Sequence, residues 1–530
     1  MSLRDRPNIL LLMTDQQRHD TVGALGNAMI RTPVLDRLAQ EGTTFRRAYT
    51  PSPVCVPARC AAMTGLPPHV TGCVDNLPLT SDASSFAEHL SDAGYQTHAA
   101  GKMHFTPDPL RSWGFEGRDV SEEEEQAGDQ DDYRQYLASA GYWHVMEPHG
   151  IRSEFYYIPQ PSQLPAKHHH SHWVVDRSLE FLERRDRDRP FMLMTSFIKP
   201  HPPFESPEPW SRLYRVPEMS LPFVPEESRE LWTYWNLVQN RYKYTDGGED
   251  HYLARLRRAA YYGCISFIDY QLGRLLKGLG DDLDNTLVIF CADHGELLGD
   301  YGCYGKRSML DSAARIPLIV RWPGGLPADH TVDDPASLLD LFPTFMDVAG
   351  IKDSRDTDEG ESLIQLAAGK SDREVVYSQF QQGEYGLYMA ASRDDKYIYS
   401  APDDKAYYLN FESDPRESRN AIDDPASSVR VSTLRQGLVD RHTLAGDALA
   451  VSRGEMRRYE PKDLRLKADE ALLFQDSEQL QREIDRLDPA YARNVSVSDG
   501  MAVRLLSARP TQDGVGSHLP EPPERTSIST

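Results

Sequence analysis

A cysteine at the start of a short predicted helix offers the clearest chemistry in the sequence. In the segment Cys55–Gly65, CVPARCAAMTG, Pro57 suits a first helical turn, where its missing N–H costs nothing, and Gly65 suits the C-terminal end. Arg59 adds a positive charge one turn into the helix. A side chain at a helix N-terminus faces unpaired backbone N–H groups and the positive end of the helix dipole. This position therefore suits an anionic nucleophile, or an anionic group transferred to it.

Charged and imidazole side chains follow several predicted strands of a parallel sheet. The apolar runs 8–13, 95–100, 191–197 and 287–292 predict strands that are buried on both faces. Ligands of open parallel sheets bind at the carboxyl edge of the strands, so residues just beyond these runs are expected to meet in one crevice. These residues are Asp15, Lys102, His104, Lys199, His201, Asp293 and His294.

The cysteine segment resembles the signature of the type I, formylglycine-dependent sulfatases of the alkaline phosphatase-like superfamily. That signature is C-x-P-x-R followed by T-G, and Cys55, Pro57, Arg59 and Thr64-Gly65 match it. The segment Tyr407–Pro415 is similar to the family's C-terminal Leu-Tyr-Asp-Leu-x-x-Asp-Pro hairpin. The resemblance covers roughly residues 7–420. It implies that a formylglycine-generating enzyme oxidises Cys55 to formylglycine after translation.

The resemblance also implies a metal site next to position 55. Asp15, Asp293 and His294, with an oxygen of residue 55 and the carbonyl oxygen of Gln16, form a hard, mostly oxygen ligand set. Such a set suits one divalent metal, with Ca²⁺ as the expected ion and Mn²⁺ or Mg²⁺ as alternatives. The family usually has an aspartate in place of Gln16 and often an asparagine in place of His294. Both departures make Mn²⁺ a rival to Ca²⁺.

The mechanism implied by the resemblance is hydrolysis of a sulfate monoester. One hydroxyl of the formylglycine hydrate attacks sulfur in line with the leaving oxygen, and expulsion of sulfate regenerates the aldehyde. Lys102, Lys306 and Asn76 match positions that hold the sulfate oxygens. The matching catalytic residues are Cys55, Arg59, Lys102, His104, His201 and Lys306, and the matching substrate-binding residues are Asn76, Lys102, Lys199, His201 and Lys306.

Three remaining roles follow from the same resemblance. Arg59 steadies the hydrate, His201 protonates the leaving group, and His104 deprotonates the second hydroxyl. The favoured function is therefore a sulfatase for a small aryl sulfate or choline sulfate. A phosphonate monoester or phosphodiester hydrolase of the same superfamily is the alternative, although such enzymes typically lack the Lys-x-His of Lys102 and His104. A non-catalytic metal-binding scaffold is a remote third.

The composition excludes some other functions. The formal net charge of −23 and the scattered basic residues argue against nucleic acid as a partner. The apolar run Ile9–Met13 is too short for a signal peptide or a membrane span, so we expect a cytoplasmic enzyme without a membrane partner. In such a compartment the six cysteines are expected to be thiols. The histidines at 168–170 and 172 are expected to be structural, because consecutive loop histidines point in different directions and no carboxylate follows at ligand spacing.

The predicted fold is α/β, with a large, mostly parallel sheet sandwiched by helices and a smaller C-terminal α+β subdomain containing an antiparallel sheet. The expected boundaries are 1–365 for the catalytic domain, 366–460 for the subdomain, and 461–530 for a helical extension and tail. The C-terminal extension could serve as an arm that joins copies of the chain, so a homo-oligomer is one alternative that the sequence leaves open. Two segments are expected to be irregular insertions, 117–167 and 207–250, which either shape substrate access or are plain solvated loops. Their aromatic residues suit an aryl ring or a quaternary ammonium, or equally the core of the loops themselves. The run 336–349 predicts one helix.

Overall fold

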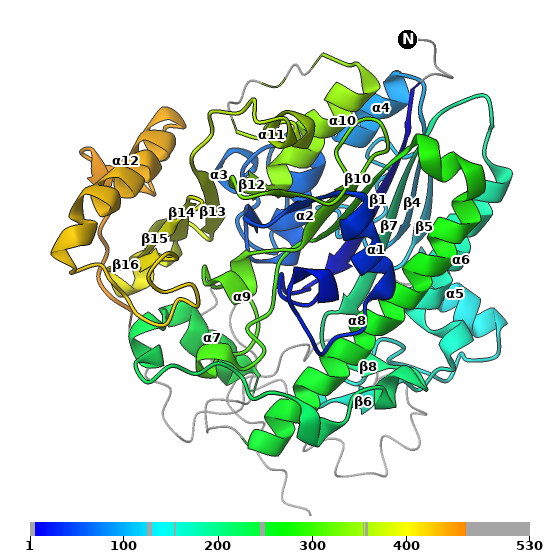
Figure 1. Ribbon diagram of the computed structural model, residues 1–530, viewed down its shortest axis with the longest axis horizontal. Coiled ribbons are helices and arrows are strands. Elements are labelled where there is room, and N and C mark those ends of the chain that lie inside the picture. The colour runs from blue at the N-terminus through cyan, green and yellow to red at the C-terminus, as the bar shows by residue number, and fades with distance from the viewer. Residues whose placement is uncertain are drawn as a thin grey trace, which may run out of the picture.

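The computed structural model describes residues 6–123, 130–152, 155–243, 250–352, 355 and 359–462. Its centre is an eight-stranded sheet in the order β11-β2-β10-β9-β1-β7-β4-β5 (Figure 1). The strands in that order are β11 (His330–Val332), β2 (Thr43–Phe45), β10 (Leu318–Arg321), β9 (Thr286–Ala292), β1 (Asn8–Asp15), β7 (Phe191–Pro200), β4 (Gln96–Gly101) and β5 (Gly117–Val120).

The five strands from β9 to β5 run parallel to one another, which confirms the mostly parallel sheet predicted from the sequence. In β1, Leu11 pairs with Met194 of β7 on one side and with Ile289 of β9 on the other. Strand β10 is antiparallel to both of its neighbours, β9 and β2. Because β9, β1, β7 and β4 are adjacent and parallel, their carboxyl ends lie at one edge of the sheet.

Helices cover both faces of this sheet, as Figure 1 shows. Successive residues of a strand point to opposite faces, so Leu11 of β1 packs into one layer and Leu12 into the other. The layer beside Leu11 contains α2 (Cys55–Thr64), α4 (Phe86–Asp92) and α10 (Leu341–Ala349). The layer beside Leu12 contains α1 (Pro33–Glu41), α6 (His170–Arg184) and α8 (His251–Leu279).

A four-stranded antiparallel sheet forms the predicted C-terminal subdomain. Its strands are β13 (Val376–Phe380), β14 (Leu387–Ala391), β15 (Asp395–Ser400) and β16 (Lys405–Asn410). One face packs on α12 (Ser428–Leu444), through contacts that include Tyr388 and Leu438. The other face packs on the part of the chain that contains the central sheet, and Met389 and Leu310 belong to one apolar cluster between the two parts. The predicted extension lies outside the described residues from 463 onwards.

The remaining elements are short. They are the helices α3 (Pro68–Thr71), α5 (Asp132–Ser139), α7 (Tyr234–Tyr242), α9 (Asp311–Ala314) and α11 (Leu363–Ala367), and the strand pairs β3 (Ala48–Tyr49) with β12 (Ala336–Ser337), β6 (Gln160–Pro161) with β8 (Glu205–Ser206), and β17 (Val451–Ser452) with β18 (Glu455–Met456). All six cysteines are free thiols.

Three sequence predictions were wrong. The segment 117–167 is not wholly irregular, because Gly117–Val120 forms the edge strand β5 by pairing with β4, although its sequence GRDV carries no apolar pattern. The run 336–349 is not one helix, because the Ser337 hydroxyl and the Asp340 carboxylate cap a new helical turn after a short strand. A carboxylate does follow the histidine cluster, since Asp176 lies 3.4 Å from His172 on the next turn of α6.

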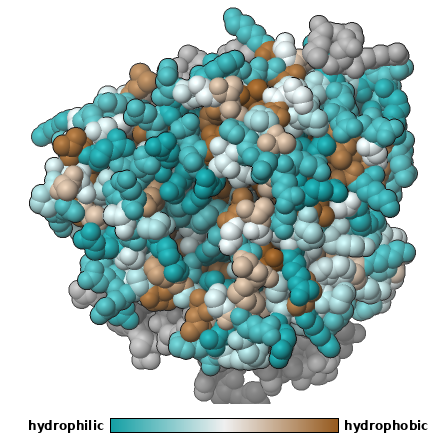
Figure 2. Space-filling view, in the orientation of Figure 1, coloured by the Kyte–Doolittle hydropathy of each residue, from teal (hydrophilic) through white to brown (hydrophobic). Residues whose placement is uncertain are grey.

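The surface shown in Figure 2 is mostly hydrophilic, with hydrophobic residues scattered among polar ones. This agrees with the strongly acidic composition of the chain. No helix among the described residues combines the length and the apolar character that a bilayer crossing needs.

Candidate active site

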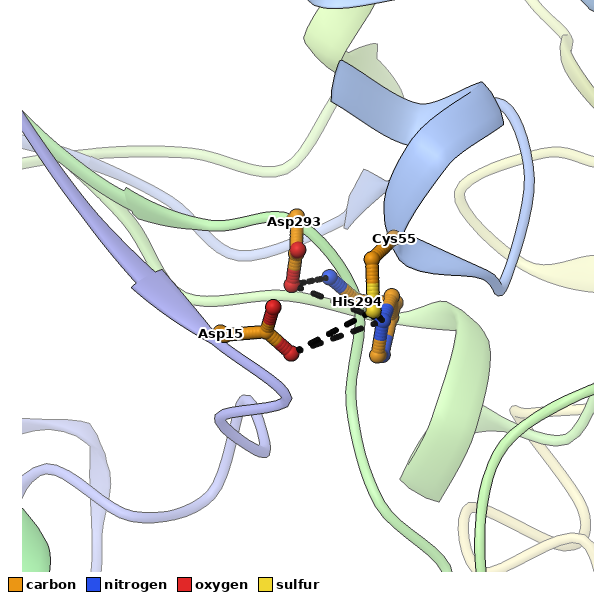
Figure 3. A group of neighbouring side chains, drawn as sticks. All are labelled: Asp15, Cys55, Asp293 and His294. Atoms are coloured by element: carbon orange, nitrogen blue, oxygen red, sulfur yellow. Dashed lines mark hydrogen bonds and ion pairs between the residues drawn. The ribbon is translucent and has the colours of Figure 1, made fainter. Parts of the chain in front are cut away.

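The carboxyl edge of the central sheet brings together side chains from segments far apart in the sequence. Asp15 ends β1, and Asp293 and His294 directly follow β9. Helix α2 begins at Cys55 against this edge, and Figure 3 shows the four side chains pointing toward one another. The Cys55 Sγ lies 3.5 Å from Asp15 Oδ1 and 3.2 Å from His294 Nε2. The edge predicted from the ends of the strands is therefore the place where the cysteine helix begins.

Helix α2 has the form that its sequence predicts. Val54 is extended, with φ −150°, and its carbonyl accepts the first helical hydrogen bond from the Ala58 N–H at 3.0 Å. Gly65 ends the helix with φ 64°, a left-handed conformation that glycine adopts without strain. Burial, followed by the nearby Asp15 carboxylate, raises the pKa of the Cys55 thiol to about 12. An unmodified thiol at this position is therefore protonated at neutral pH and is a weak nucleophile.

Four buried side chains form a candidate metal site. Ligand atoms of Asp15, Cys55, Asp293 and His294 all lie within 4.8 Å of one another. Within the described ranges, no other group of three or more His, Cys, Asp and Glu side chains has this spacing. Burial alone would raise the pKa of Asp293, but the His294 and Arg59 charges hold it below its ordinary value. The carboxylate is therefore ionised and able to bind a cation.

Gln16 supports the same assignment through an unpaired atom. Its side-chain N–H group donates to Glu296 and to the Tyr157 hydroxyl, which fixes the orientation of the amide. Its backbone N–H donates to Asp293 Oδ1 at 3.0 Å, and its Oε1 is buried without a hydrogen-bond partner. A buried carbonyl oxygen without a donor is costly unless it binds a cation or water. The residues present therefore fit a hard divalent metal ion.

Two cations balance the carboxylates from the other side. Arg59 Nε donates to Asp293 Oδ2 at 2.8 Å, and its Nη2 lies 3.3 Å from Asp15 Oδ2. Lys102 Nζ lies 2.6 Å from Asp15 Oδ2 and 2.5 Å from Glu123 Oε2, and Lys102 is fully buried. The lysine predicted to hold sulfate oxygens is thus bound between two carboxylates. The positive charge of Lys102 is balanced by these two carboxylates.

A cavity of about 560 Å³ opens over Cys55. Lys306 lies at its base, where its Nζ is 2.7 Å from Cys55 Sγ. Lys199 does not line the cavity, because its Nζ donates to the carbonyl oxygens of His149 at 2.8 Å and Pro203 at 2.7 Å. The predicted substrate-binding role of Lys199 therefore has no support in the structure. The predicted residues that line the cavity are Cys55, Asn76, His104, His201 and Lys306.

Two histidines face this cavity. Burial and then the Lys102 charge hold the pKa of His104 well below its usual range, and its Nδ1 is buried without a hydrogen-bond partner. Burial also lowers the pKa of His201, although its Nδ1 lies 3.0 Å from Glu123 Oε1. Both rings are therefore neutral in the free protein, and each can accept a proton.

Sequence reasoning missed four residues of the site. Glu123, Arg152 and Arg307 line the cavity, and Glu296 holds the Gln16 amide. Arg307 adjoins a predicted lysine and Glu296 follows the metal-ligand pair, so their positions in the sequence offered a signal. Glu123 belongs to an acidic run that is typical of a solvated loop, so its position in the sequence offered no signal that this residue belongs to the site. From the segment 207–250, no described residue lines the cavity.

Comparisons with known proteins agree with this architecture. The family model described as Sulfatase matches residues 7–351, and the model described as N-sulphoglucosamine sulphohydrolase, C-terminal, matches residues 299–443. An arylsulfatase of Clostridium perfringens (strain 13 / Type A) is 30% identical over 464 residues, covering 82% of this chain and 94% of its own length. A choline-sulfatase of Rhizobium meliloti (strain 1021) is 31% identical over 453 residues, covering 81% of this chain and 85% of its own.

A solved structure has the same fold. The phosphonate monoester hydrolase of Agrobacterium radiobacter superposes with a TM-score of 0.71 at 24% identity, covering 86% of this chain and 100% of its own. At that identity the likeness establishes the fold alone. The family model spans more than half of the chain, and the relatives match over most of their length. The chain therefore belongs to the sulfatase family of the alkaline phosphatase-like superfamily and is a sulfuric ester hydrolase.

Proposed function

We propose that this enzyme hydrolyses the sulfate monoester of a small organic molecule, with formylglycine made from Cys55 as its nucleophile and one divalent cation as its cofactor. The observation that carries the proposal is the position of Cys55 Sγ, which lies where the helix N-terminus, the buried carboxylates, Lys306 and the cavity meet. The Sγ stands in for the oxygens of the formylglycine hydrate, because both are bonded to Cβ. A formylglycine-generating enzyme is the partner that maturation requires.

The cation would be held by Asp15, Gln16, Asp293 and His294 together with residue 55. When bound, it supplies a positive charge that lowers the pKa of a hydroxyl group. Ca²⁺ suits the carboxylate and amide oxygens. Mn²⁺ and Mg²⁺ are the alternatives, and Mn²⁺ is favoured by the imidazole of His294 and by Gln16, which contributes no charge.

The remaining catalytic and binding roles belong to side chains in and around the cavity. Lys306 donates to a sulfate oxygen, where a fixed cation stabilises charge that develops during transfer, and Asn76 adds an amide donor from the cavity wall. Arg59 is held by two carboxylates and orients the nucleophile. His201 transfers a proton to the leaving oxygen, after the anionic substrate has favoured its protonated form. His104, a neutral base with a free Nδ1, removes the proton that releases sulfate.

Lys102 acts differently from the sulfate clamp that the sequence suggested. It neutralises Asp15 and Glu123 at 2.6 and 2.5 Å, and so lowers the repulsion between these carboxylates and an incoming sulfate. We therefore assign it a positioning role behind the cavity.

The test is a substrate panel on protein produced with and without the converting enzyme. Peptide mass spectrometry measures the aldehyde at position 55, and turnover of 4-nitrophenyl sulfate, choline sulfate and a phenyl phosphonate monoester is followed in parallel. We expect sulfate hydrolysis in proportion to the aldehyde content, and none in Cys55→Ala. Full activity in a preparation that contains only the thiol would refute the nucleophile. A higher kcat/KM for the phosphonate than for every sulfate would favour the alternative hydrolase.

A further inference from the structure

The wall of the substrate cavity carries an excess of positive charge. Its described lining residues include three basic side chains, Lys306, Arg152 and Arg307, and one carboxylate, Glu123. The two lining histidines are neutral, because burial lowers the pKa of each. Phe105 is the one phenylalanine, tyrosine or tryptophan among the described lining residues. The cavity therefore favours an anionic ligand over a cationic one.

Two of the three cations already make contacts shorter than 3 Å with partners in the protein. Lys306 lies at the reacting centre, 2.7 Å from Cys55 Sγ, and serves the sulfate that is transferred. Arg152 Nη1 donates to Glu123 Oε1 at 2.6 Å, and Glu123 Oε2 accepts from Lys102 Nζ. The single carboxylate of the wall is thus held by cations of the protein. It is not available to a cationic group on a substrate.

Arg307, the third cation, has a longer ion pair than Arg152. Its ion pair within the described part of the chain is with Asp75, at 3.5 Å, and Asp75 already accepts hydrogen bonds from the Asn76 N–H at 2.8 Å and from Gln381 Nε2 at 2.7 Å. The guanidinium also lies over the Phe380 ring, with Cζ 5.5 Å from the centroid. These contacts hold the side chain at the cavity wall without neutralising it fully.

The backbone at Arg307 supports a functional role. Its φ is 60°, a left-handed conformation that non-glycine residues rarely adopt, and its N–H donates to the Pro53 carbonyl at 3.0 Å. Successive side chains of an extended segment point to opposite sides, yet Lys306 and Arg307 both line the cavity. Strained backbone of this kind is concentrated at ligand sites. Here it accompanies two adjacent cations that face the same cavity.

We propose that Arg307 binds a second anionic group on the leaving-group side of the substrate. The preferred substrates would then be organosulfates whose alcohol or phenol part itself carries a carboxylate or another anion. A quaternary ammonium such as that of choline sulfate would face Arg307 and Arg152, with Phe105 as the one aromatic ring among the described lining residues instead of a cage of several. This inference rests on the proposed sulfatase function and names its substrate class.

The experiment compares two isosteric substrates with the converted, metal-loaded enzyme. They are para-sulfated phenylacetate, which is anionic, and para-sulfated phenylacetamide, which is neutral at the same position and has a phenol of similar acidity. The variants are Arg307→Asn, since asparagine tolerates the left-handed backbone, and Arg307→Lys, which keeps the charge. Arg46→Gln is the matched control, because Arg46 is exposed and pairs with Asp333 instead of lining the cavity.

We expect the wild type to prefer the phenylacetate by about 10- to 100-fold in kcat/KM, as for a hydrogen bond to a charged group. Arg307→Asn should lose this preference because its kcat/KM falls more for the phenylacetate than for the phenylacetamide, Arg307→Lys should retain part of the preference, and Arg46→Gln should match the wild type. High salt should reduce the preference.

Equal kcat/KM values of the wild type for the two isosteres would overturn the inference, as would a higher kcat/KM for choline sulfate than for the phenylacetate. An equal loss on both isosteres in Arg307→Asn would overturn it too. In each of these cases the sulfatase function stands. If the wild type with a confirmed aldehyde hydrolyses none of the sulfates, the proposed function itself is wrong.

Discussion

Glu296 gives the sharpest test of how the metal site is built, because this residue holds a ligand without being one. It is fully buried, and its Oε1 accepts from the backbone N–H groups of Leu298 at 2.9 Å and Gly305 at 2.6 Å. Its Oε2 accepts from the Gln16 side chain and from the Tyr157 hydroxyl at 2.7 Å. Glu296→Gln keeps the shape of the side chain and places an N–H group opposite the Gln16 N–H group.

The size of the effect follows from these contacts. The Tyr157 hydroxyl can turn and accept from the new amide, so the bond lost is the one that Gln16 donates to a carboxylate. A hydrogen bond to a charged group contributes about 1.5–3 kcal/mol, and about 2 kcal/mol corresponds to roughly 30-fold in affinity. If Gln16 instead rotates to present its oxygen to the new amide, it turns its N–H group toward the cation. Either response weakens metal binding.

Calorimetric titration with Ca²⁺ and Mn²⁺ measures this effect directly, and thermal unfolding without metal checks the fold. Tyr157→Phe is the matched control, because it removes the hydroxyl that donates to Glu296 and accepts from Gln16 at 3.3 Å but keeps the carboxylate that accepts from Gln16, so we expect nearly wild-type affinity. The exchanged pair Gln16→Glu with Glu296→Gln restores a donor opposite an acceptor and should recover binding. Wild-type metal affinity in Glu296→Gln would refute the role of Gln16 as a ligand.

Three further outcomes are expected. Lys306→Ala should lower kcat/KM for sulfate esters by about 10²- to 10³-fold with little change in the thermal midpoint, since a preorganised cation is lost. His104→Ala should release about one equivalent of leaving group in a rapid burst and then stall, and steady turnover without a burst would contradict its role. Asp269 accepts the N–H groups of Val34 and Leu35 at 3.1 and 2.8 Å, and burial raises its pKa to about 7. Between about pH 4 and pH 7 the folded chain therefore retains a proton on Asp269 that the unfolded chain has lost. The contribution of this proton to the free energy of unfolding is present at low pH and is lost as pH rises through about 7. Relative to wild type, Asp269→Asn should become more stable between pH 5 and pH 8 in thermal melts.

Local sequence patterns were sufficient to predict the cysteine helix and the main strands of the central sheet. Pro57 and Gly65 mark the ends of α2 through backbone conformation alone, so the position of Cys55 at a helix N-terminus needed no tertiary information. Apolar runs identify the buried strands of a parallel sheet, whose carboxyl ends meet at one edge. Asp15 and Asp293 were for this reason expected beside Cys55, and the structure places them there.

Contacts between distant segments were decided by the tertiary structure alone. The Glu123 carboxylate binds Lys102 and Arg152 because the end of β5 lies beside that of β4, and β5 itself has no apolar pattern in the sequence. Lys102 consequently lies between carboxylates, whereas Arg307 remains at the cavity wall. Sequence order determines which charges are available, but their pairing depends on distances that only the packed chain establishes. Pairing decides which cation stays available to a substrate, and so the specificity of the site could not be predicted from the order of the residues.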